Sequence, residues 1–280
     1  MTLPVPASIT AAALLTAALL LLPSGLSAQL TVLEQAHAHN DYQHARPMRD
    51  ALERGFNSIE ADVHLVHGQL LVAHDKDSVV ASRTLESLYL APLRAHIQRQ
   101  NGQVHPGARP LTLLIDVKGD SEQTYVVLDA LLRRYADILT IHAGAIVIDG
   151  PVAAVISGNR AIGTMRRATV RFAALDGRIS DLADTAVTHA GMGSQSPSLL
   201  MPLISDSWEH ITEWKGVGPP PPDVRPEVAR IVRRAHERGQ RVRFWGTPDN
   251  AVVWRLLRDT GVDLINADDL DALRAFLTTP

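Results

Sequence analysis

The stretch Asn57-Ser58-Ile59-Glu60-Ala61-Asp62-Val63 places two carboxylates in a largely apolar run. Side chains alternate along a β-strand with a period of two, so Glu60 and Asp62 emerge on the same face. A strand in the middle of a parallel sheet is buried on both faces, where unpaired carboxylates are costly. The pattern therefore predicts a central strand whose two carboxylates face one point, as the oxygen ligands of a metal ion do.

Imidazole, carboxylate and ammonium groups stand at the ends of other apolar runs along the chain. Chemistry on a metal-bound phosphate ester uses such groups, because hard oxygens hold the ion and imidazoles transfer protons. Asp116 and Lys118 repeat the two-residue spacing, which makes Asp116 a third candidate metal ligand. Lys118 is a candidate phosphate contact, or an ion-pair partner of the carboxylates. The candidate histidines are His37 and His39, before the quoted strand, and His74, after it.

Short apolar runs alternate with longer amphipathic ones, which is typical of parallel β/α units. The predicted strands are 32–38, 56–63, 111–117, 144–149, 160–165, 200–205, 241–246 and 262–266. The predicted helices are 46–54, 84–99, 121–137, 151–158, 178–184, 226–239, 249–260 and 268–277. This alternation predicts a single-domain α/β fold, a (β/α)8 TIM barrel over residues 29–280. Active sites of such barrels lie at the C-terminal ends of the strands, where the candidate side chains stand.

The first 28 residues carry no charge and contain an apolar run from Ile9 to Leu22. This pattern predicts a signal peptide over residues 1–28, and hence a secreted or periplasmic protein, although the usual basic residues before the apolar run are missing. An uncleaved membrane anchor and a buried core helix are the alternatives.

The composition excludes several classes of site. The formal net charge is −3, which argues against a surface that binds nucleic acid. The chain has no cysteine, so it has neither disulfides nor a thiolate metal site.

The order of these groups, His, Glu-x-Asp, His, Asp-x-Lys, resembles the glycerophosphodiester phosphodiesterase and PI-PLC-like phosphodiesterase superfamily. The spacings are similar to those of sphingomyelinase D. They are 21 residues from His39 to Glu60, 12 from Asp62 to His74, and 42 from His74 to Asp116.

Two further stretches resemble proteins of the altered-inheritance-of-mitochondria type. They are His-Asn-Asp-Tyr at 39–42 and Val-Arg-Phe-Trp-Gly-Thr-Pro at 242–248. The resemblance extends over nearly the whole predicted mature chain. The His-Arg-Gly segment of glycerophosphodiesterases is absent, however, because Asn40 follows His39, and this leaves the substrate open.

The resemblance implies a phosphoric diester hydrolase that depends on one divalent cation, Mg²⁺ or Ca²⁺. Its implied metal ligands are Glu60, Asp62 and Asp116, and its implied acid/base pair is His39 and His74. Lys118, Asn40, Trp245 and Asn266 are the candidate substrate contacts. Trp245 would stack on an apolar or choline-like group, or belong to ordinary barrel packing.

Three questions stay open at this level. His37-Ala38-His39 at the end of a first barrel strand is also how metal-dependent amidohydrolases begin, and a barrel that binds phosphodiesters without turnover is a third class. The sequence does not decide between His37 and His39 as the first catalytic histidine. The substrate is expected to be a glycerophosphodiester or a phospholipid-type molecule, with transient membrane-surface contact and the oligomeric state left open.

Overall fold

The computed structural model describes Met1, residues 30–183 and residues 196–279. Apart from Met1, the predicted signal peptide lies outside these residues and stays a prediction. Among the described residues, no helix combines the length and the apolar character needed to cross a bilayer.

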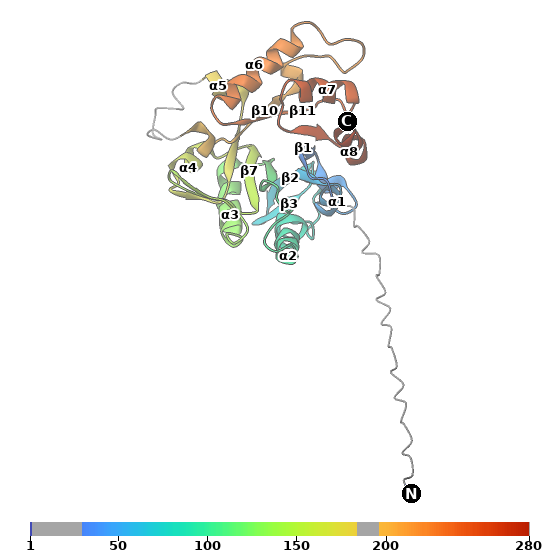
Figure 1. The fold of residues 1–280 in the computed structure, drawn as a ribbon. Coiled ribbons are helices and arrows are strands. Elements are labelled where there is room, and N and C mark those ends of the chain that lie inside the picture. The colour runs from blue at the N-terminus through green and yellow to red at the C-terminus, as the bar shows by residue number, and fades with distance from the viewer. Residues whose placement is uncertain (2–29, 184–195, 280) are drawn as a thin grey trace.

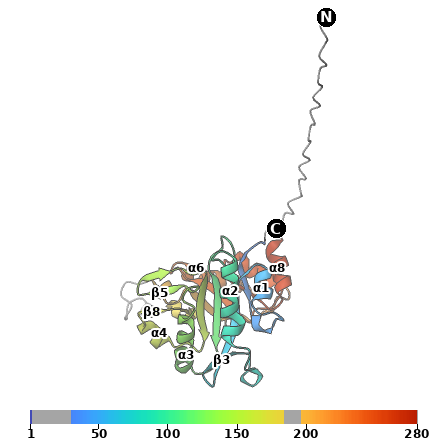
Figure 2. The same ribbon diagram turned by 90° about the horizontal axis from the view of Figure 1, so that it is seen from below.

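Eight parallel strands form a nearly closed barrel, with the helices arranged around its outside (Figure 1; Figure 2). Their order around the sheet is β11-β10-β9-β7-β4-β2-β1-β12, and the bridge between Arg243 and Leu264 joins the two ends. The strands are β1 (Leu33–Ala38), β2 (Phe56–Val66), β4 (Leu111–Val117), β7 (Val152–Gly158), β9 (Ala174–Gly177), β10 (Leu203–Ser207), β11 (Arg241–Trp245) and β12 (Ile265–Ala267). The predicted barrel architecture is therefore present.

The α-helices of the described residues cover the outer face of this sheet (Figure 1). They are α1 (Arg49–Glu53), α2 (Ala91–Arg99), α3 (Ser121–Arg133), α4 (Ile162–Arg167), α5 (Ile179–Ala183), α6 (Val224–His236), α7 (Ala251–Asp259) and α8 (Leu270–Thr278). α6 illustrates why they form where they do. Pro226 stands in its first turn, where its missing N–H costs nothing, and Val228, Ile231, Val232 and Ala235 form its buried face.

Three parts of the middle of the chain differ from the prediction. The predicted strand 144–149 lies outside the barrel, as the exposed strand β6 (Ile146–Ile148) of a small antiparallel sheet with β5 (Ile141–Ala143) and β8 (Val170–Arg171). The predicted helix 151–158 is the barrel strand β7, and the predicted strand 160–165 is helix α4.

The physical reason is that β7 is buried on both faces between β4 and β9 and so has no apolar period. Its Ala-rich run, Val-Ala-Ala-Val-Ile-Ser-Gly, is compatible with a helix until its neighbours are known. β9 was not predicted, because only two of its four residues, Ala-Leu-Asp-Gly, are apolar. The other six predicted strands overlap barrel strands.

A hairpin returns the chain to the end of β2. β3 (Gln69–Val72) pairs antiparallel with β2, with Val72 opposite Val63, and His67 and Gly68 form the turn with positive φ angles. Residue 74 is thereby placed beside the C-terminal end of β2.

The barrel interior has an apolar floor beneath a polar layer. Leu114, Val155, Leu203 and Leu264 form a buried cluster separate from the main core. Side chains two residues further along a strand point the same way, so Asp116 follows Leu114, Ser157 follows Val155 and Asn266 follows Leu264. The polar layer therefore lies nearer the C-terminal ends of the strands.

Candidate active site

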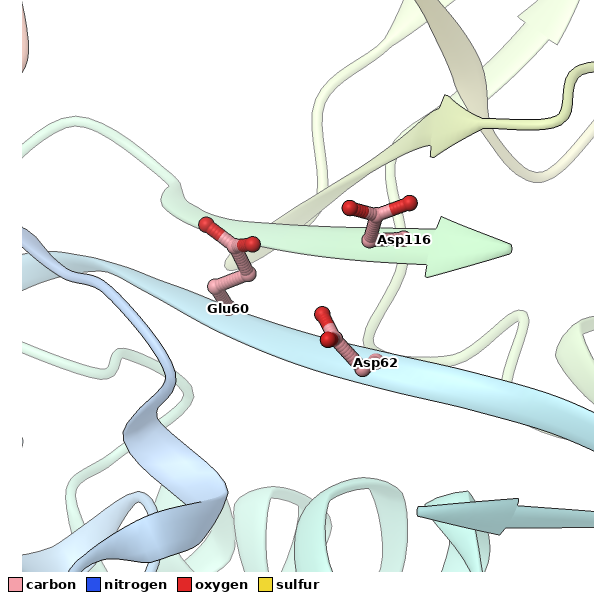
Figure 3. A group of neighbouring side chains, drawn as sticks. All are labelled: Glu60, Asp62 and Asp116. Atoms are coloured by element: carbon pink, nitrogen blue, oxygen red, sulfur yellow. The ribbon is translucent and has the colours of Figure 1, made fainter. Parts of the chain in front are cut away.

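Glu60, Asp62 and Asp116 converge inside the barrel. Glu60 and Asp62 rise from the same side of β2, and Asp116 stands on the neighbouring strand β4, directly paired with Asp62 (Figure 3). One carboxylate oxygen from each of the three residues lies within 4.8 Å of the other two. The two-residue spacing on β2 and the parallel register of β2 with β4 are sufficient to produce this arrangement.

The unpaired oxygens of this carboxylate cluster suit a divalent cation. Asp62 Oδ1 and Asp116 Oδ1 are buried and accept no hydrogen bond from the described residues. Burial and the nearby charge of Glu60 raise the pKa of Asp62, so a cation would offset an existing electrostatic cost. Gly158 keeps this space open, because a side chain there would collide with Asp116 Oδ1. The site therefore fits a hard cation such as Mg²⁺ or Ca²⁺.

Arg243 is a functional candidate that the sequence analysis missed. Its Nη1 donates to Glu60 Oε2 at 3.0 Å, and both residues are almost fully buried. Burial alone would raise the pKa of Glu60, but Arg243 and the hydrogen bond from His37 outweigh it and hold that pKa below its usual range. Its sequence signal is a charged residue in the middle of Val242-Arg243-Phe244, two positions before Trp245.

His37 forms a hydrogen bond with Glu60 inside the barrel. It is fully buried, and burial together with Arg243 lowers its pKa to about 4, so it is neutral at pH 7. Glu60 is an acceptor, so Nε2 of His37 carries the proton and donates to Glu60 Oε2 at 2.9 Å. Nδ1 then accepts from the Ser58 hydroxyl at 2.7 Å. Both nitrogens are engaged inside the barrel.

Lys118 bridges two of the carboxylates. Its Nζ lies 3.0 Å from Asp62 Oδ2 and 2.9 Å from Asp116 Oδ2. Burial would lower the pKa of this lysine, but the two carboxylates raise it above its ordinary value. It is thus an ion-pair partner of the carboxylates, and its side chain also lines the cavity described below.

His39 is held by a carboxylate from the far end of the chain. Its Nδ1 lies 2.9 Å from Asp268 Oδ1, and Asn40 Nδ2 lies 3.0 Å from the same ring nitrogen. Burial opposes protonation, but the hydrogen bond to Asp268 prevails and raises the pKa of His39. Asp268 was not predicted, although it repeats the two-residue spacing after Asn266. Its carboxylate engages Nδ1, and none of the described residues forms a hydrogen bond with Nε2 of His39.

His74 and Tyr42 meet over Asp62. His74 Nδ1 lies 3.2 Å from Asp62 Oδ2, and the Tyr42 hydroxyl donates to the same oxygen at 2.8 Å. The tyrosine oxygen also lies 3.3 Å from His74 Nδ1 and 2.6 Å from Asn40 Oδ1. Tyr42 is almost completely buried, whereas 58% of the His74 side chain is exposed. Tyr42 thus joins the two histidine-bearing segments, a role the sequence analysis did not assign.

Asp41 lies buried beside this group without joining it. Its Oδ2 accepts from the Met48 amide and from the Tyr89 hydroxyl. Burial raises its pKa to about 7.

A cavity of about 400 Å³ opens over the carboxylate cluster. Most of the sequence-predicted site residues line it, together with Arg178 and Arg243. Its lining residues are His39, Asn40, Glu60, His74, Asp116, Val117, Lys118, Ser157, Gly158, Asn159, Arg178, Arg243 and Trp245. Asp62 lies beneath it, fully buried. Asn266 is also buried, beside His37 on the neighbouring strand, and is not among the lining residues.

A second cavity, of about 410 Å³, lies at the opposite end of the barrel, around Val32, Met48 and His105. None of the predicted site residues lines it, so its volume alone does not make it an active-site candidate.

Comparisons with known proteins bear on the fold and on the family of this chain. A solved structure, a glycerophosphodiester phosphodiesterase from Parabacteroides distasonis, is similar with a TM-score of 0.50 and 15% identity, covering 87% of this chain and 96% of that one. That likeness concerns the fold. Altered inheritance of mitochondria protein 6 of Eremothecium gossypii is 31% identical over 286 residues, which cover 90% of this chain and 71% of that protein.

A homologue of that protein from Arthroderma benhamiae is also 31% identical, over 267 residues that cover 86% of this chain and 82% of the homologue. The model of the AIM6-like phosphodiesterase domain matches residues 27–176, which hold the carboxylate cluster, His39 and His74. The chain therefore belongs to the AIM6-like phosphodiesterase domain family.

Proposed function

We propose that this protein is a metal-dependent phosphoric diester hydrolase that cleaves a glycerophosphodiester or phospholipid-type substrate by acid/base catalysis with His39 and His74. The observation that carries the proposal is the convergence of three carboxylate oxygens within 4.8 Å. The two histidines line the cavity that opens over these oxygens. Membership of a phosphodiesterase family supports the same reaction class.

Glu60, Asp62 and Asp116 would hold one Mg²⁺ or Ca²⁺. When bound, such an ion supplies electrophilic polarisation of a phosphoryl oxygen and orients the ester. Other residues of the chain fix the charge and the position of these ligands. Arg243 and His37 keep Glu60 ionised and fix one of its oxygens, while Lys118 partly neutralises the two aspartates. Lys118 also lines the cavity, where its ammonium group can contact a phosphate oxygen.

His39 serves as the general base. Its Nδ1–H donates to Asp268, so the lone pair of Nε2 is free to take the proton from an attacking water or substrate hydroxyl. The Asp268 carboxylate stabilises the imidazolium that results.

His74 serves as the general acid. Its Nδ1 is held near Asp62 and Tyr42, which leaves Nε2 to protonate the departing alkoxide oxygen. Its exposed position suits a leaving group that departs into solvent. Attack by a neighbouring hydroxyl would give a cyclic phosphate first, whereas attack by water would give the open monoester directly.

The amidohydrolase alternative has less support. It would use His37 as a metal ligand, but both nitrogens of His37 are engaged, and Arg243 Nη1 lies 3.0 Å from Nε2. A fixed cation at this distance opposes a metal ion at the same nitrogen. Tightly bound zinc in the purified protein would favour the amidohydrolase instead.

The test is a panel of phosphodiesters assayed with the purified protein, after treatment with EDTA, and after Mg²⁺ or Ca²⁺ is restored. We expect cleavage to disappear with EDTA and to return with one of the two ions. Phosphorus NMR of the products distinguishes a cyclic phosphate from a monoester. Cleavage that is insensitive to EDTA in fully metal-free protein would contradict the proposed metal dependence.

A further inference from the structure

Arg178 and Trp245 form a charged wall on one side of the cavity. Arg178 directly follows β9, Trp245 ends β11, and both residues line the cavity. The guanidinium carbon of Arg178 lies 4.8 Å from the centre of the Trp245 ring, a cation–π contact. One face of this tryptophan therefore already carries a positive charge from the protein.

This Arg178–Trp245 wall begins on the side of the barrel opposite His39. Counted in either direction around the ring of eight strands, β9 stands four strands from β1, which His39 directly follows. The carboxylate cluster lies on β2, which is next to β1, and on β4, which stands midway between β1 and β9. A phosphorus atom held at that cluster would place one of its ester groups toward Arg178. The wall is thus positioned to contact the alcohol portion of the substrate.

Arg178 is held in place by its neighbours. Its Nη1 donates to Asp176 Oδ2 and to the Gly177 carbonyl oxygen, each at 3.0 Å. Asp176 is fully buried and also accepts from the Ser157 hydroxyl at 2.7 Å. About a fifth of the Arg178 side chain, 21%, remains exposed. The fixed guanidinium therefore needs little ordering when a ligand binds.

The other charged groups near Arg178 form hydrogen bonds with backbone groups or with His210. Asp181 Oδ2 accepts from the backbone N–H of Arg178, and Asp206 accepts from backbone N–H groups and lies beside His210. Arg160 donates to the carbonyl oxygen of Asp176. None of these three side chains lines the cavity.

The charged residues that line the cavity are of both signs, and the buried Asp62 and Asp176 add two carboxylates that pair with Lys118 and Arg178. Three are cationic, Lys118, Arg178 and Arg243, and two are acidic, Glu60 and Asp116. A divalent ion at the carboxylate cluster would make this set of groups positive overall. A quaternary ammonium group at Trp245 would be repelled by the guanidinium of Arg178. A carboxylate or phosphate would instead form charge-assisted hydrogen bonds with this guanidinium.

We propose that the Arg178–Trp245 wall selects phosphodiesters whose alcohol portion carries a second anionic group, and disfavours choline-like alcohols. This inference rests on the proposed phosphodiesterase function and adds a substrate class to it. It opposes the alternative in which Trp245 stacks on a choline-like group, because the Arg178 guanidinium already lies against that ring.

Three diesters of glycerol phosphate provide the test, because they differ mainly in the charge of the second alcohol: glycerate, glycerol and choline. We expect kcat/KM to decrease in that order in the wild-type protein with restored metal, with about tenfold between the glycerate and choline diesters. A choline diester cleaved as efficiently as the glycerate diester would overturn the inference and leave the proposed function intact. Cleavage of none of the three would overturn the proposed function, and the inference with it.

Variants then assign the preference to Arg178. We expect Arg178→Gln to reduce the glycerate-to-choline ratio of kcat/KM by about tenfold. Because this change leaves Asp176 buried without its cation, the double variant Arg178→Gln/Asp176→Asn removes both charges, and thermal melting checks that it folds. Arg166→Gln, an exposed arginine on α4, is the matched control. An unchanged ratio in a folded Arg178 variant would refute the assignment.

Discussion

The two halves of the barrel contribute differently to the cavity. The N-terminal half, from β1 to β4, supplies the carboxylate cluster and both proposed catalytic histidines. The C-terminal half, from β7 to β12, supplies Arg178, Arg243 and Trp245. The first half thus holds the groups that are proposed to act on the substrate. The second half adds positive charge to the cavity and holds those groups in place. The two tasks can therefore be separated experimentally.

The largest effect is expected in the first half. We predict that His39→Ala or His74→Ala lowers kcat about a thousandfold on every cleaved diester, because each removes one proton-transfer group. Steady-state kinetics with restored metal measure this effect, and circular dichroism checks the fold. His236→Ala, an exposed histidine on α6, is the control. Full activity in either catalytic variant would end the proposed acid/base mechanism.

A smaller effect is expected at Asp268, which stands in the C-terminal half of the barrel and contacts His39 of the N-terminal half. We predict that Asp268→Asn lowers kcat about tenfold to a hundredfold, because His39 loses the carboxylate that orients it and stabilises its charge. The effect should be smaller than that of His39→Ala, since 67% of the Asp268 side chain is exposed to water.

Asp271→Asn is the matched control for this prediction, because Asp271 is similarly exposed and pairs with Arg54 outside the cavity. A loss in Asp268→Asn as large as that in His39→Ala would show that the two halves act as one catalytic unit. No loss would show that the contact is not used in catalysis.

The smallest effect concerns stability. Burial raises the pKa of Asp41 from 3.8 to about 7, so the folded protein binds a proton there more tightly than the unfolded chain does. The contribution of Asp41 to the free energy of unfolding therefore decreases as the pH rises from about 4 to about 7, and is constant above that range. Asp41→Asn removes this contribution. Relative to wild type, the variant should gain stability across that pH range.

Urea unfolding at a series of pH values measures the difference between the two proteins. Asp77→Asn, at an exposed aspartate in the turn Lys76–Ser78, distinguishes a general charge effect from the buried one. A difference between Asp41→Asn and wild type that is the same at every pH would show that Asp41 titrates normally in the folded protein.

The proposed reaction centre was accessible from the sequence because its residues interrupt apolar strands. Glu60 and Asp62 stand two residues apart in β2, and Asp116 has the same context in β4, so their shared face follows from strand geometry. Arg243 has a similar context in β11 but was overlooked, because a single arginine does not indicate which carboxylate it faces. Arg178 has no such context, since the short strand β9 ends just before it.

The barrel architecture, six of its eight strands and the candidate metal ligands could be predicted from the sequence, because periodic side chains and short-range spacing encode them. The tertiary structure is needed to identify Val152–Gly158 as a strand, because this segment pairs with β4 along one edge and with β9 along the other. It alone paired His39 with Asp268, 229 residues apart, and Glu60 with Arg243, 183 residues apart. Such contacts depend on how the ends of the sheet meet, which no local pattern records.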